Sequence, residues 1–185
     1  MVPGREAVTA LLLLAAAAAL GATPHTGPGI LNFHEVSTGI YRGGQPTTEG
    51  WAFLKEKGVK TVVKLNFEEE GSDAQARTLG MTVIDASGPP ATIKNVWGAP
   101  KPERLQLAVN ALGDKRLHPI YVHCLHGQDR TGLVVGLHRV INEGVPKQTA
   151  WEEMKRIGFH RSLRGLRAVW RKFDGKTIPG TVKND

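Results

Sequence analysis

The strongest constraint on this chain is a change of pattern around residue 124. Residues 119–123 form a short apolar run with β-branched and aromatic side chains, which is typical of a buried strand. Residues 133–141 are mostly apolar and favour a helix, and Gly144 follows them as a stop signal. The polar, glycine-containing stretch between them is therefore predicted to be the turn that joins a strand to a helix.

This predicted turn has the chemistry of an anion-binding site. Its backbone N–H groups can surround a tetrahedral oxyanion, and the following helix adds unpaired N–H donors and the positive end of its dipole. Cys124, the single cysteine of the sequence, stands at the start of the turn, and Arg130 stands near its end. The same positive field stabilises a thiolate, so Cys124 is expected to be ionised near neutral pH and to act as a nucleophile.

The neighbouring residues suit the same chemistry. Gly127 permits the backbone twist that turns amides inward, and Gly132 lets the helix pack closely. Thr131 can offer its hydroxyl to the sulfur once a phosphate has left, and His123 is a supporting residue. The residues expected to bind phosphate are Leu125, His126, Gly127, Gln128, Asp129 and Arg130.

The stretch from His123 to Gly132 resembles the His-Cys-x5-Arg-Thr-Gly signature of the protein tyrosine phosphatase superfamily. The segment Tyr-Arg-Gly-Gly-Gln-Pro at 41–46 is similar to the Tyr-Arg-Ser-Gly-Gln-Pro segment of the compact dual-specificity branch, especially its atypical plant, fungal and bacterial members. Residues 61–66, 150–154 and 158–159 extend the resemblance over roughly 32–172. The resemblance implies a phosphatase that works through a phosphocysteine and needs no cofactor or metal.

Two other interpretations of the cysteine are weaker. A buried, inert cysteine would not explain the surrounding histidine, arginine, threonine and glycines. A metal site built from His118, His123, Cys124 and His126 uses acceptable ligands, but the metal would occupy the sulfur that Arg130 is placed to assist. Neither alternative accounts for all the residues from His123 to Gly132.

Hydrolysis of this kind also needs a carboxyl that protonates the leaving oxygen and then activates water. Asp85 is the first candidate, because it ends a predicted strand where the family keeps a mobile acid loop, although it could instead be a turn-forming Asp. Asp129 is the rival, since an Asp before the signature Arg resembles the loop of the myotubularin phosphatases. Glu103, in the first turn of a predicted helix, is the third.

The alternation of patterns predicts an α/β fold with a central, mainly parallel sheet flanked by helices. Strands are expected at 40–42, 59–65, 81–86 and 120–123. Helices are expected at 48–57, 71–79, 102–112, 131–142, 147–157 and 162–173. The last three should pack on one face, and the site should lie at the carboxyl ends of the strands.

The two ends of the chain do not fit this pattern. Residues 1–22 contain an apolar run at 7–20 followed by small residues, which indicates a signal peptide, and this run falls short of the ~20 residues that span a bilayer. A membrane anchor is the alternative. Residues 23–31 are expected to be a flexible linker, 32–175 the domain and 176–185 a C-terminal tail, in a secreted or periplasmic protein.

The formal net charge of +7 favours an anionic partner. Many cations fall in the last two predicted helices, where they form either a solvated face or a surface for the phosphates of an inositol polyphosphate; they are Lys155, Arg156, His160, Arg161, Arg164, Arg167, Arg171 and Lys172. A phosphoprotein is the substrate that the family resemblance implies. We expect a monomer that binds no nucleic acid, and a non-catalytic phosphate-binding protein is the alternative of another class.

Overall fold

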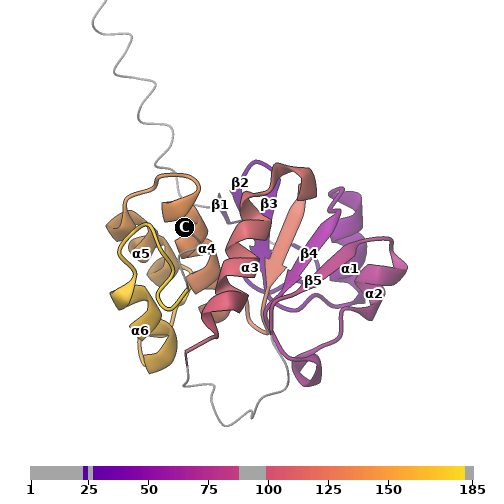
Figure 1. Cartoon of the computed structure of the whole chain (residues 1–185). Helices are drawn as coiled ribbons and strands as arrows, with labels where there is room; N and C mark the ends of the chain where they lie inside the picture. The colour runs from indigo at the N-terminus through magenta and orange to yellow at the C-terminus, as the bar shows by residue number, and fades with distance from the viewer. Residues whose placement is uncertain (1–22, 25–26, 88–98, 182–185) are drawn as a thin grey trace, which may run out of the picture.

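The computed structural model describes residues 23–24, 27–87 and 99–181, which form an α/β fold around one sheet (Figure 1). The six strands of the sheet lie in the order β1-β2-β3-β6-β4-β5. Strands β3, β6, β4 and β5 are parallel to one another, whereas β1 and β2 are antiparallel additions at one edge. The strands are β1 (Thr23–Pro24), β2 (His34–Ser37), β3 (Ile40–Gly43), β4 (Thr61–Lys64), β5 (Thr82–Asp85) and β6 (Ile120–His123).

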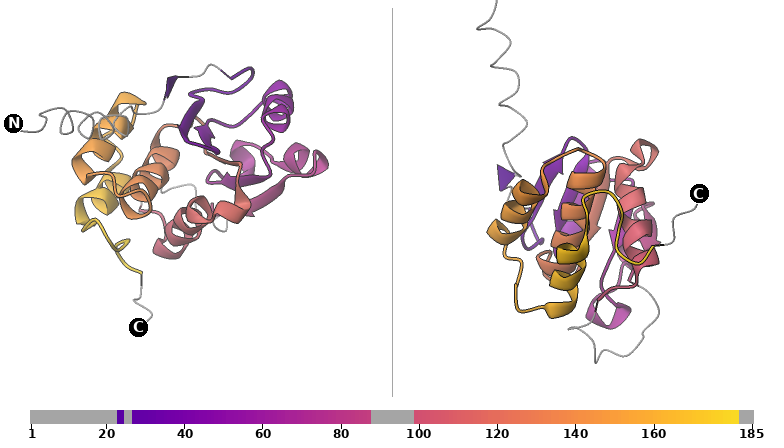
Figure 2. Two further views of the ribbon diagram at one scale, coloured as in Figure 1. Left: turned by 90° about the horizontal axis from the view of Figure 1, so that it is seen from above. Right: turned by 60° about the vertical axis from the view of Figure 1, so that its left-hand side comes forward.

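Helices cover both faces of the sheet (Figure 2). On one face, α1 (Thr48–Glu56) and α2 (Ala74–Thr78) pack around Trp51 and Tyr121. On the other face, four helices share a larger core with Val63 and Val122. These four are α3 (Pro102–Gly113), α4 (Asp129–Ile141), α5 (Lys147–Arg156) and α6 (Arg164–Lys172). The expected mainly parallel sheet with helices on its faces is confirmed.

The central strands form where they do because their apolar side chains pack on both faces of the sheet. All four residues of β6 and all four of β4 are buried, as expected of parallel strands that are covered by helices on both sides. Because consecutive side chains alternate, Val122 faces α4 whereas Tyr121 faces α1. The hydrophobic effect therefore fixes both the position of β6 in the middle of the sheet and the direction in which the chain leaves it.

The expected helices and strands agree with the structure to within a few residues, with one larger difference. The helix expected at 71–79 is reduced to α2, and the residues before it form a short 3-10 helix, η2 (Glu68–Glu70). A second 3-10 helix, η4 (Lys115–Leu117), precedes β6. Strand β2 was not expected, because its sequence His-Glu-Val-Ser shows no apolar run and it lies near the edge of the sheet.

The domain extends beyond its expected limits at both ends. Ile30 is 8% exposed, and Gly29 accepts a hydrogen bond from the backbone N–H of Thr47, so residues 27–31 pack on the domain rather than forming a free linker. Ile178 is 1% exposed, which ties the first part of the expected tail to the core formed with α3 to α6. Burial of a single isoleucine stabilises each segment at a place where composition suggested a linker or tail.

The expected signal peptide, residues 1–22, lies outside the described residues. Within the described ranges, no helix is both long and apolar enough to cross a membrane.

Candidate active site

Cys124 lies at the carboxyl end of the central strand β6, in the loop that leads into α4. Strands β3 and β4 flank β6 on its two sides, with Gly43 and Lys64 paired to His123. The cysteine is 3% exposed and forms no disulfide. The predicted strand, turn and helix are therefore present. The turn lies at the carboxyl ends of the parallel strands, which is where binding and catalytic sites occur in α/β folds.

The backbone of this loop is held open by residues from the N-terminal part of the chain. Three consecutive carbonyl oxygens accept hydrogen bonds from outside the loop: Leu125 O from the backbone N–H of Gln45 at 3.0 Å, His126 O from Asn32 Nδ2 at 2.9 Å, and Gly127 O from Arg42 Nη2 at 2.8 Å.

The consequence follows from peptide geometry. The C=O and N–H groups of a trans peptide point in opposite directions. The N–H groups of His126, Gly127 and Gln128 therefore point away from these partners and toward the inside of the loop. This is the arrangement of donors that an oxyanion needs.

Two glycines allow the loop to lie directly on this scaffold. Gly127 has φ of 73°, and a Cβ placed there would lie 2.2 Å from the carbonyl carbon of Gly43. A Cβ at Gly44 would lie 2.9 Å from the carbonyl oxygen of Leu125. Larger residues at either position would push the loop off the segment that orients its carbonyls.

Arg130 completes the loop from the first turn of α4, where the helix also leaves its first N–H groups unpaired. Its guanidinium forms a two-point ion pair with Glu70, Nη1 to Oε2 at 2.6 Å and Nη2 to Oε1 at 2.7 Å. Nη1 also donates to the carbonyl oxygen of Leu65 at 3.3 Å, and the ring of Phe67 lies 5.9 Å from the guanidinium carbon. These contacts fix the direction of the guanidinium.

The ion pair shifts the pKa values of both Glu70 and Arg130. Burial alone raises the pKa of Glu70, but the hydrogen bonds and charge of Arg130 lower it below its ordinary value. Burial likewise lowers the pKa of Arg130, whereas Glu70, Cys124 and Asp129 raise it, and the net effect is a raised pKa. Arg130 therefore stays a cation beside Cys124.

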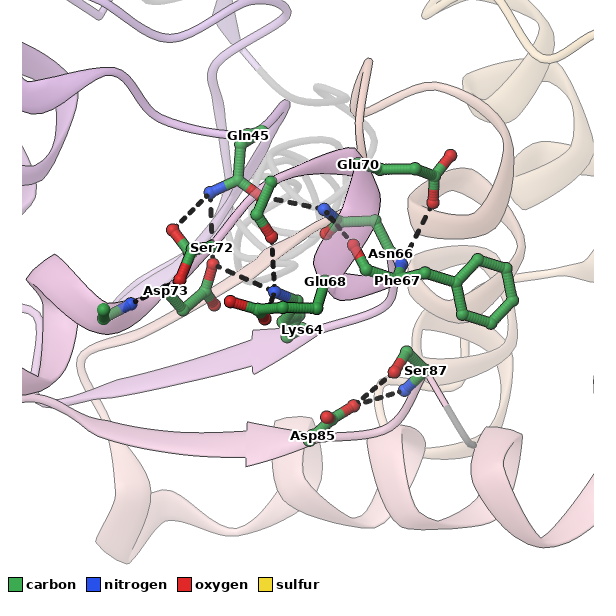
Figure 3. Close-up of polar contacts among 12 residues, drawn as sticks. Gln45, Lys64, Asn66, Phe67, Glu68, Glu70, Ser72, Asp73, Asp85 and Ser87 are labelled. Carbon is green, nitrogen blue, oxygen red and sulfur yellow. Dashed lines mark hydrogen bonds and ion pairs between the residues drawn. The ribbon is translucent and has the colours of Figure 1, made fainter. Parts of the chain in front are cut away.

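Glu70 also accepts a hydrogen bond from the backbone N–H of Phe67 at 3.0 Å, and it lies beside a polar network at the end of β4 (Figure 3). The buried ammonium of Lys64 donates to Glu68 at 2.6 Å and to the carbonyl oxygen of Gly71, and it lies 3.9 Å from Asp73. Gln45 connects this network to the loop, because its side chain contacts Asp73 at 3.1 Å while its backbone N–H holds Leu125. The strand end, the η2 segment and the cysteine loop thus form one connected unit.

His123 is oriented by the same network. Its Nε2 lies 3.0 Å from Oδ2 of Asp73, and both side chains are fully buried. Burial raises the pKa of Asp73, but the hydrogen bond and charge of His123, together with Gln45 and Lys64, lower it overall. Nδ1 of His123 has no hydrogen-bond partner among the described residues.

Thr131 and Gly132 occupy the first turn of α4, where the sequence placed them. The hydroxyl of Thr131 is fully buried and has no partner in the described part of the chain, so it is free to bond a group that changes during a reaction. A Cβ at Gly132 would lie 3.4 Å from the ring of Phe159, which agrees with the expected close packing of this helix.

The three candidate acids differ in their surroundings. Asp85 ends β5, the edge strand two positions from β6, and its Oδ1 accepts hydrogen bonds from the backbone N–H of Ser87 at 2.9 Å and from Ser87 Oγ at 2.5 Å (Figure 3). It thus forms the turn that was its alternative role. Residues 88–98, which contain most of the expected acid loop, lie outside the described residues, so its assignment as the acid stays a prediction.

Asp129 is engaged by the segment after α5. Its Oδ1 accepts from the backbone N–H of His160 at 2.7 Å, and Oδ2 lies 3.0 Å from His160 Nδ1. Glu103 is exposed in the first turn of α3. Asp129 therefore has a definite structural partner, and its assignment as the acid also stays a prediction.

The ligands of the alternative metal site do not converge. His118 precedes β6 and its Nε2 contacts the carbonyl oxygen of Leu112 at 3.0 Å, whereas Cys124 follows the strand at its other end. No group of three or more histidine, cysteine, aspartate or glutamate side chains able to hold a metal is found within the described ranges.

Sequence reasoning missed the residues that support the loop. Glu70 stood in an acidic run expected to open a helix, and no local signal connects it to an arginine 60 residues later. Asn32, Arg42 and Gln45 reach the loop across 94, 85 and 80 residues, respectively. The resemblance of segment 41–46 to the dual-specificity branch was the signal that pointed to two of them.

Comparison with known proteins gives a family match over most of the chain. Residues 26–165 match a family model described as a DSP-PTPase phosphatase fused to NAD+ kinase. The match includes the cysteine loop and the segment 41–46 that supports it.

Two curated relatives are similar in sequence. Dual specificity protein phosphatase TpbA of Pseudomonas aeruginosa is 31% identical over 129 residues, which is 70% of this chain and 56% of the relative. Inositol diphosphatase DSP3 of Arabidopsis thaliana is 31% identical over 145 residues, which is 75% of this chain and 68% of the relative. The chain thus spans little more than half the length of TpbA.

One solved structure extends the comparison to the fold. The crystal structure of a P. aeruginosa TpbA variant in complex with pTyr superimposes with a TM-score of 0.62 at 25% identity, covering 84% of this chain and 91% of that chain.

Proposed function

The chain belongs to the DSP-PTPase family of phosphatases, and we propose that it is a cysteine-dependent phosphomonoesterase that acts through a phosphocysteine intermediate. The observation that carries the proposal is the cysteine loop. Three outward carbonyls leave three amides facing the inside of the loop, next to Cys124 and Arg130. This arrangement supports phosphoryl binding by the protein's own groups.

In the first step, the thiolate of Cys124 attacks phosphorus and the bond from phosphorus to the ester oxygen breaks. The phosphoryl oxygens are held by the amides of residues 125–130 and by Arg130, whose direction Glu70 fixes. The leaving oxygen takes a proton from the general acid, for which Asp85 remains the first candidate. The products of this step are the alcohol and a phosphocysteine.

In the second step, water attacks the phosphocysteine. The carboxylate that gave up its proton now accepts one from the water, the bond from phosphorus to sulfur breaks, and inorganic phosphate leaves. The returning thiolate receives a hydrogen bond from the buried hydroxyl of Thr131, which has no other partner in the described structure. Charge and atoms balance without any further reactant.

A phosphorylated protein is the first substrate class that we propose. TpbA is named as a dual specificity protein phosphatase, and the solved variant of it contains pTyr. Phe67 stands beside the guanidinium of Arg130 and offers an apolar wall to the group that carries the phosphate.

An inositol polyphosphate is the second candidate, and a specific contact favours it. The segment that joins α5 to α6 touches the cysteine loop directly: His160 binds Asp129, and a Cβ at Gly158 would lie 2.4 Å from the side chain of Gln128. His160 therefore borders the loop, and the exposed basic residues Arg156 and Arg161 lie near it in sequence, where they could hold phosphates that do not react.

Export is part of the proposal, because residues 1–22 have the pattern of a signal peptide. The mature protein would then be secreted or periplasmic. Mass measurement of the protein recovered outside the cytoplasm tests this: loss of the N-terminal segment is expected, and an intact mass in the cytoplasm contradicts it.

The decisive experiment measures phosphate release by the purified protein from a phosphotyrosine peptide, a phosphoserine peptide and inositol hexakisphosphate. Cys124→Ser is the control. We expect release that vanadate inhibits and chelators do not affect. Preference for the phosphotyrosine peptide supports the protein-phosphatase assignment, and preference for the inositide gives the cations beside the loop a substrate role.

Two outcomes would contradict the proposal. Activity that a chelator abolishes and Cys124→Ser leaves unchanged would rule out cysteine chemistry. Phosphate binding without release from any of the three substrates would identify a non-catalytic phosphate-binding protein instead.

A further inference from the structure

Arg42 is a buried cation that the mechanism above does not use. It lies in β3 opposite Val122 of β6, so its side chain is on the face of the sheet that α4 and α5 cover. It is 2% exposed and is among the largest fully buried side chains of the described structure. Buried arginines are rare because desolvation of the charge is costly, so this one calls for a compensating role.

The guanidinium of Arg42 contacts the loop that carries Cys124. Nη2 donates to the carbonyl oxygen of Gly127 at 2.8 Å, and this bond turns the N–H of Gln128 toward the inside of the loop. The same nitrogen would lie 3.7 Å from a Cβ at Gly132, so the guanidinium passes beside the first turn of α4. Its Nε is buried without a partner in the described part of the chain.

The charge of Arg42 is less compensated than that of the loop's own arginine. Arg130 is neutralised by its two-point contact with Glu70. The carboxylate near Arg42 is Glu153 of α5, but both of its oxygens are hydrogen-bonded to Arg139. Among the described residues, no side-chain hydrogen bond or ion pair joins Arg42 to a carboxylate, so more of its field reaches the loop.

The charges of three ionisable groups act on Arg42. They are Cys124 after β6, Glu153 on α5 and Tyr121, whose side chain lies on the opposite face of the sheet. Burial has the largest effect and lowers the pKa of Arg42 to about 10, whereas each of these three groups raises it. Arg42 is therefore a cation at neutral pH. Burial also raises the pKa of Tyr121, and negative charge on Cys124 and Asp73 adds to this, so Tyr121 is neutral there.

We propose that Arg42 is a positioning residue of the Cys124 site, which fixes the Gly127 peptide from the buried side and holds the thiolate by its positive charge. It contacts neither the phosphoryl group nor the leaving group. The inference rests on the proposed function only in taking Cys124 as the nucleophile. In this role, one residue of β3 fixes the shape of the anion-binding loop and supplies part of its positive charge.

Alkylation of Cys124 tests the proposal without any substrate. The rate of reaction with iodoacetamide is measured against pH in the full chain, since only the thiolate reacts and Cys124 is the single cysteine. We expect Arg42→Gln, which keeps a donor but loses the charge, to move the midpoint of the curve to higher pH. Alkylation at pH 6 should be about tenfold slower than in the wild type.

Two further variants distinguish the effect of the positive charge from the effect of the hydrogen bond to Gly127 and from general destabilisation. Arg42→Lys keeps the charge and should return most of the wild-type reactivity. Glu143→Gln is the control for destabilisation, because Glu143 pairs with Arg139 at the other end of α4 and its loss leaves the contact between Arg139 and Glu153 in place. It should lower the melting temperature while the midpoint stays at its wild-type value.

The outcomes distinguish this inference from the proposed function. A wild-type midpoint near that of an ordinary thiol, about 8.5, would remove the nucleophile and with it the proposed function. A low wild-type midpoint that Arg42→Gln leaves unchanged would overturn the role of Arg42 alone. If Arg42→Gln does not fold, Glu153→Gln decides: loss of the opposing carboxylate should lower the midpoint, and an unchanged or higher midpoint overturns the inference.

Discussion

The two ends of helix α4 use buried polar side chains in different ways. Around its first turn, the Thr131 hydroxyl, His123 Nδ1 and Arg42 Nε are buried without partners in the described structure. Around its last turn, Glu143 accepts from Ser37 at 2.8 Å, contacts His138 at 3.2 Å and also pairs with Arg139. Arg139 is paired again by Glu153. The first end leaves buried polar groups without hydrogen-bond partners, whereas Glu143, His138 and Arg139 at the other end all have partners within the protein.

This difference separates function from stability within a single helix. An unsatisfied buried polar group costs free energy, so several of them around one loop indicate a place where a ligand or a reaction completes the bonding. At the other end, ion pairs join α4 to α5 and a hydrogen bond from Ser37 joins Glu143 to β2, so these groups are already bonded within the protein. Variants at the first end should therefore change rate, and variants at the second end should change stability.

The largest effect is expected for Cys124→Ser. Loss of the nucleophilic sulfur should reduce phosphate release on the order of 10³-fold or more. The melting temperature should stay close to that of the wild type, because the substitution removes little packing volume. Calorimetry and phosphate release measured on the same preparation check both parts, and a large fall in melting temperature would contradict the separation.

The next effect concerns the general acid. Asp85→Asn should lower the rate on a substrate with a poor leaving group on the order of 10²-fold, because the leaving oxygen would no longer receive a proton. Asp129→Asn should cost clearly less, since Asp129 is held by His160. The reverse order would move the role of acid to Asp129, and equal small losses would exclude both residues.

A smaller effect is expected for Glu70→Gln. The amide can bond only one side of the guanidinium, so Arg130 would lose its fixed direction, and the rate should fall roughly tenfold. Glu69→Gln is the matched control, because Glu69 lies next to it in η2 and shares no contact with Arg130 among those described here. Steady-state kinetics of both variants make the measurement. Equal losses of rate in the two variants would contradict the positioning role of Glu70.

The smallest effect on rate is expected at the other end of the helix. Glu143→Gln should lower the free energy of unfolding by about 1–3 kcal/mol, because it leaves Arg139 and His138 without their common partner. Phosphate release should change less than about twofold. Chemical denaturation and kinetics on the same variant make the measurement, and a strong loss of activity with unchanged stability would reverse the comparison.

The same carboxylate gives a pH dependence of stability. Burial raises the pKa of Glu143, but hydrogen bonds from His138, Ser37 and Arg139 lower it to about 2, below the value near 4.3 of an unfolded glutamate. Its contribution is therefore complete above the unfolded pKa and is lost as the pH falls toward about 2. Acid denaturation of Glu143→Gln should lack this component, and an identical acid profile would contradict the assignment.

Local pattern was enough to predict much of this molecule. The apolar run at 120–123 and the helical pattern after Gly132 predicted β6 and α4, and the cysteine loop between them follows from the same change of pattern. Strand β2 and the 3-10 helix η2 were not predicted. A strand near the edge of the sheet needs no apolar run, and η2 depends in part on a contact with Lys64 from β4, which no local pattern shows.

The sequence by itself determined which chemistry is available: one cysteine, an arginine six residues later, and the glycines that let a backbone turn around an anion. Only the tertiary structure decided how that chemistry is held. Glu70, Asn32 and Arg42 reach the loop across 60 to 94 residues, and contacts at that separation depend on strand order, which no local pattern encodes. The types of residue in the loop determine which reactions are available. The orientation of these residues depends on parallel strands that bring distant segments together at their carboxyl ends.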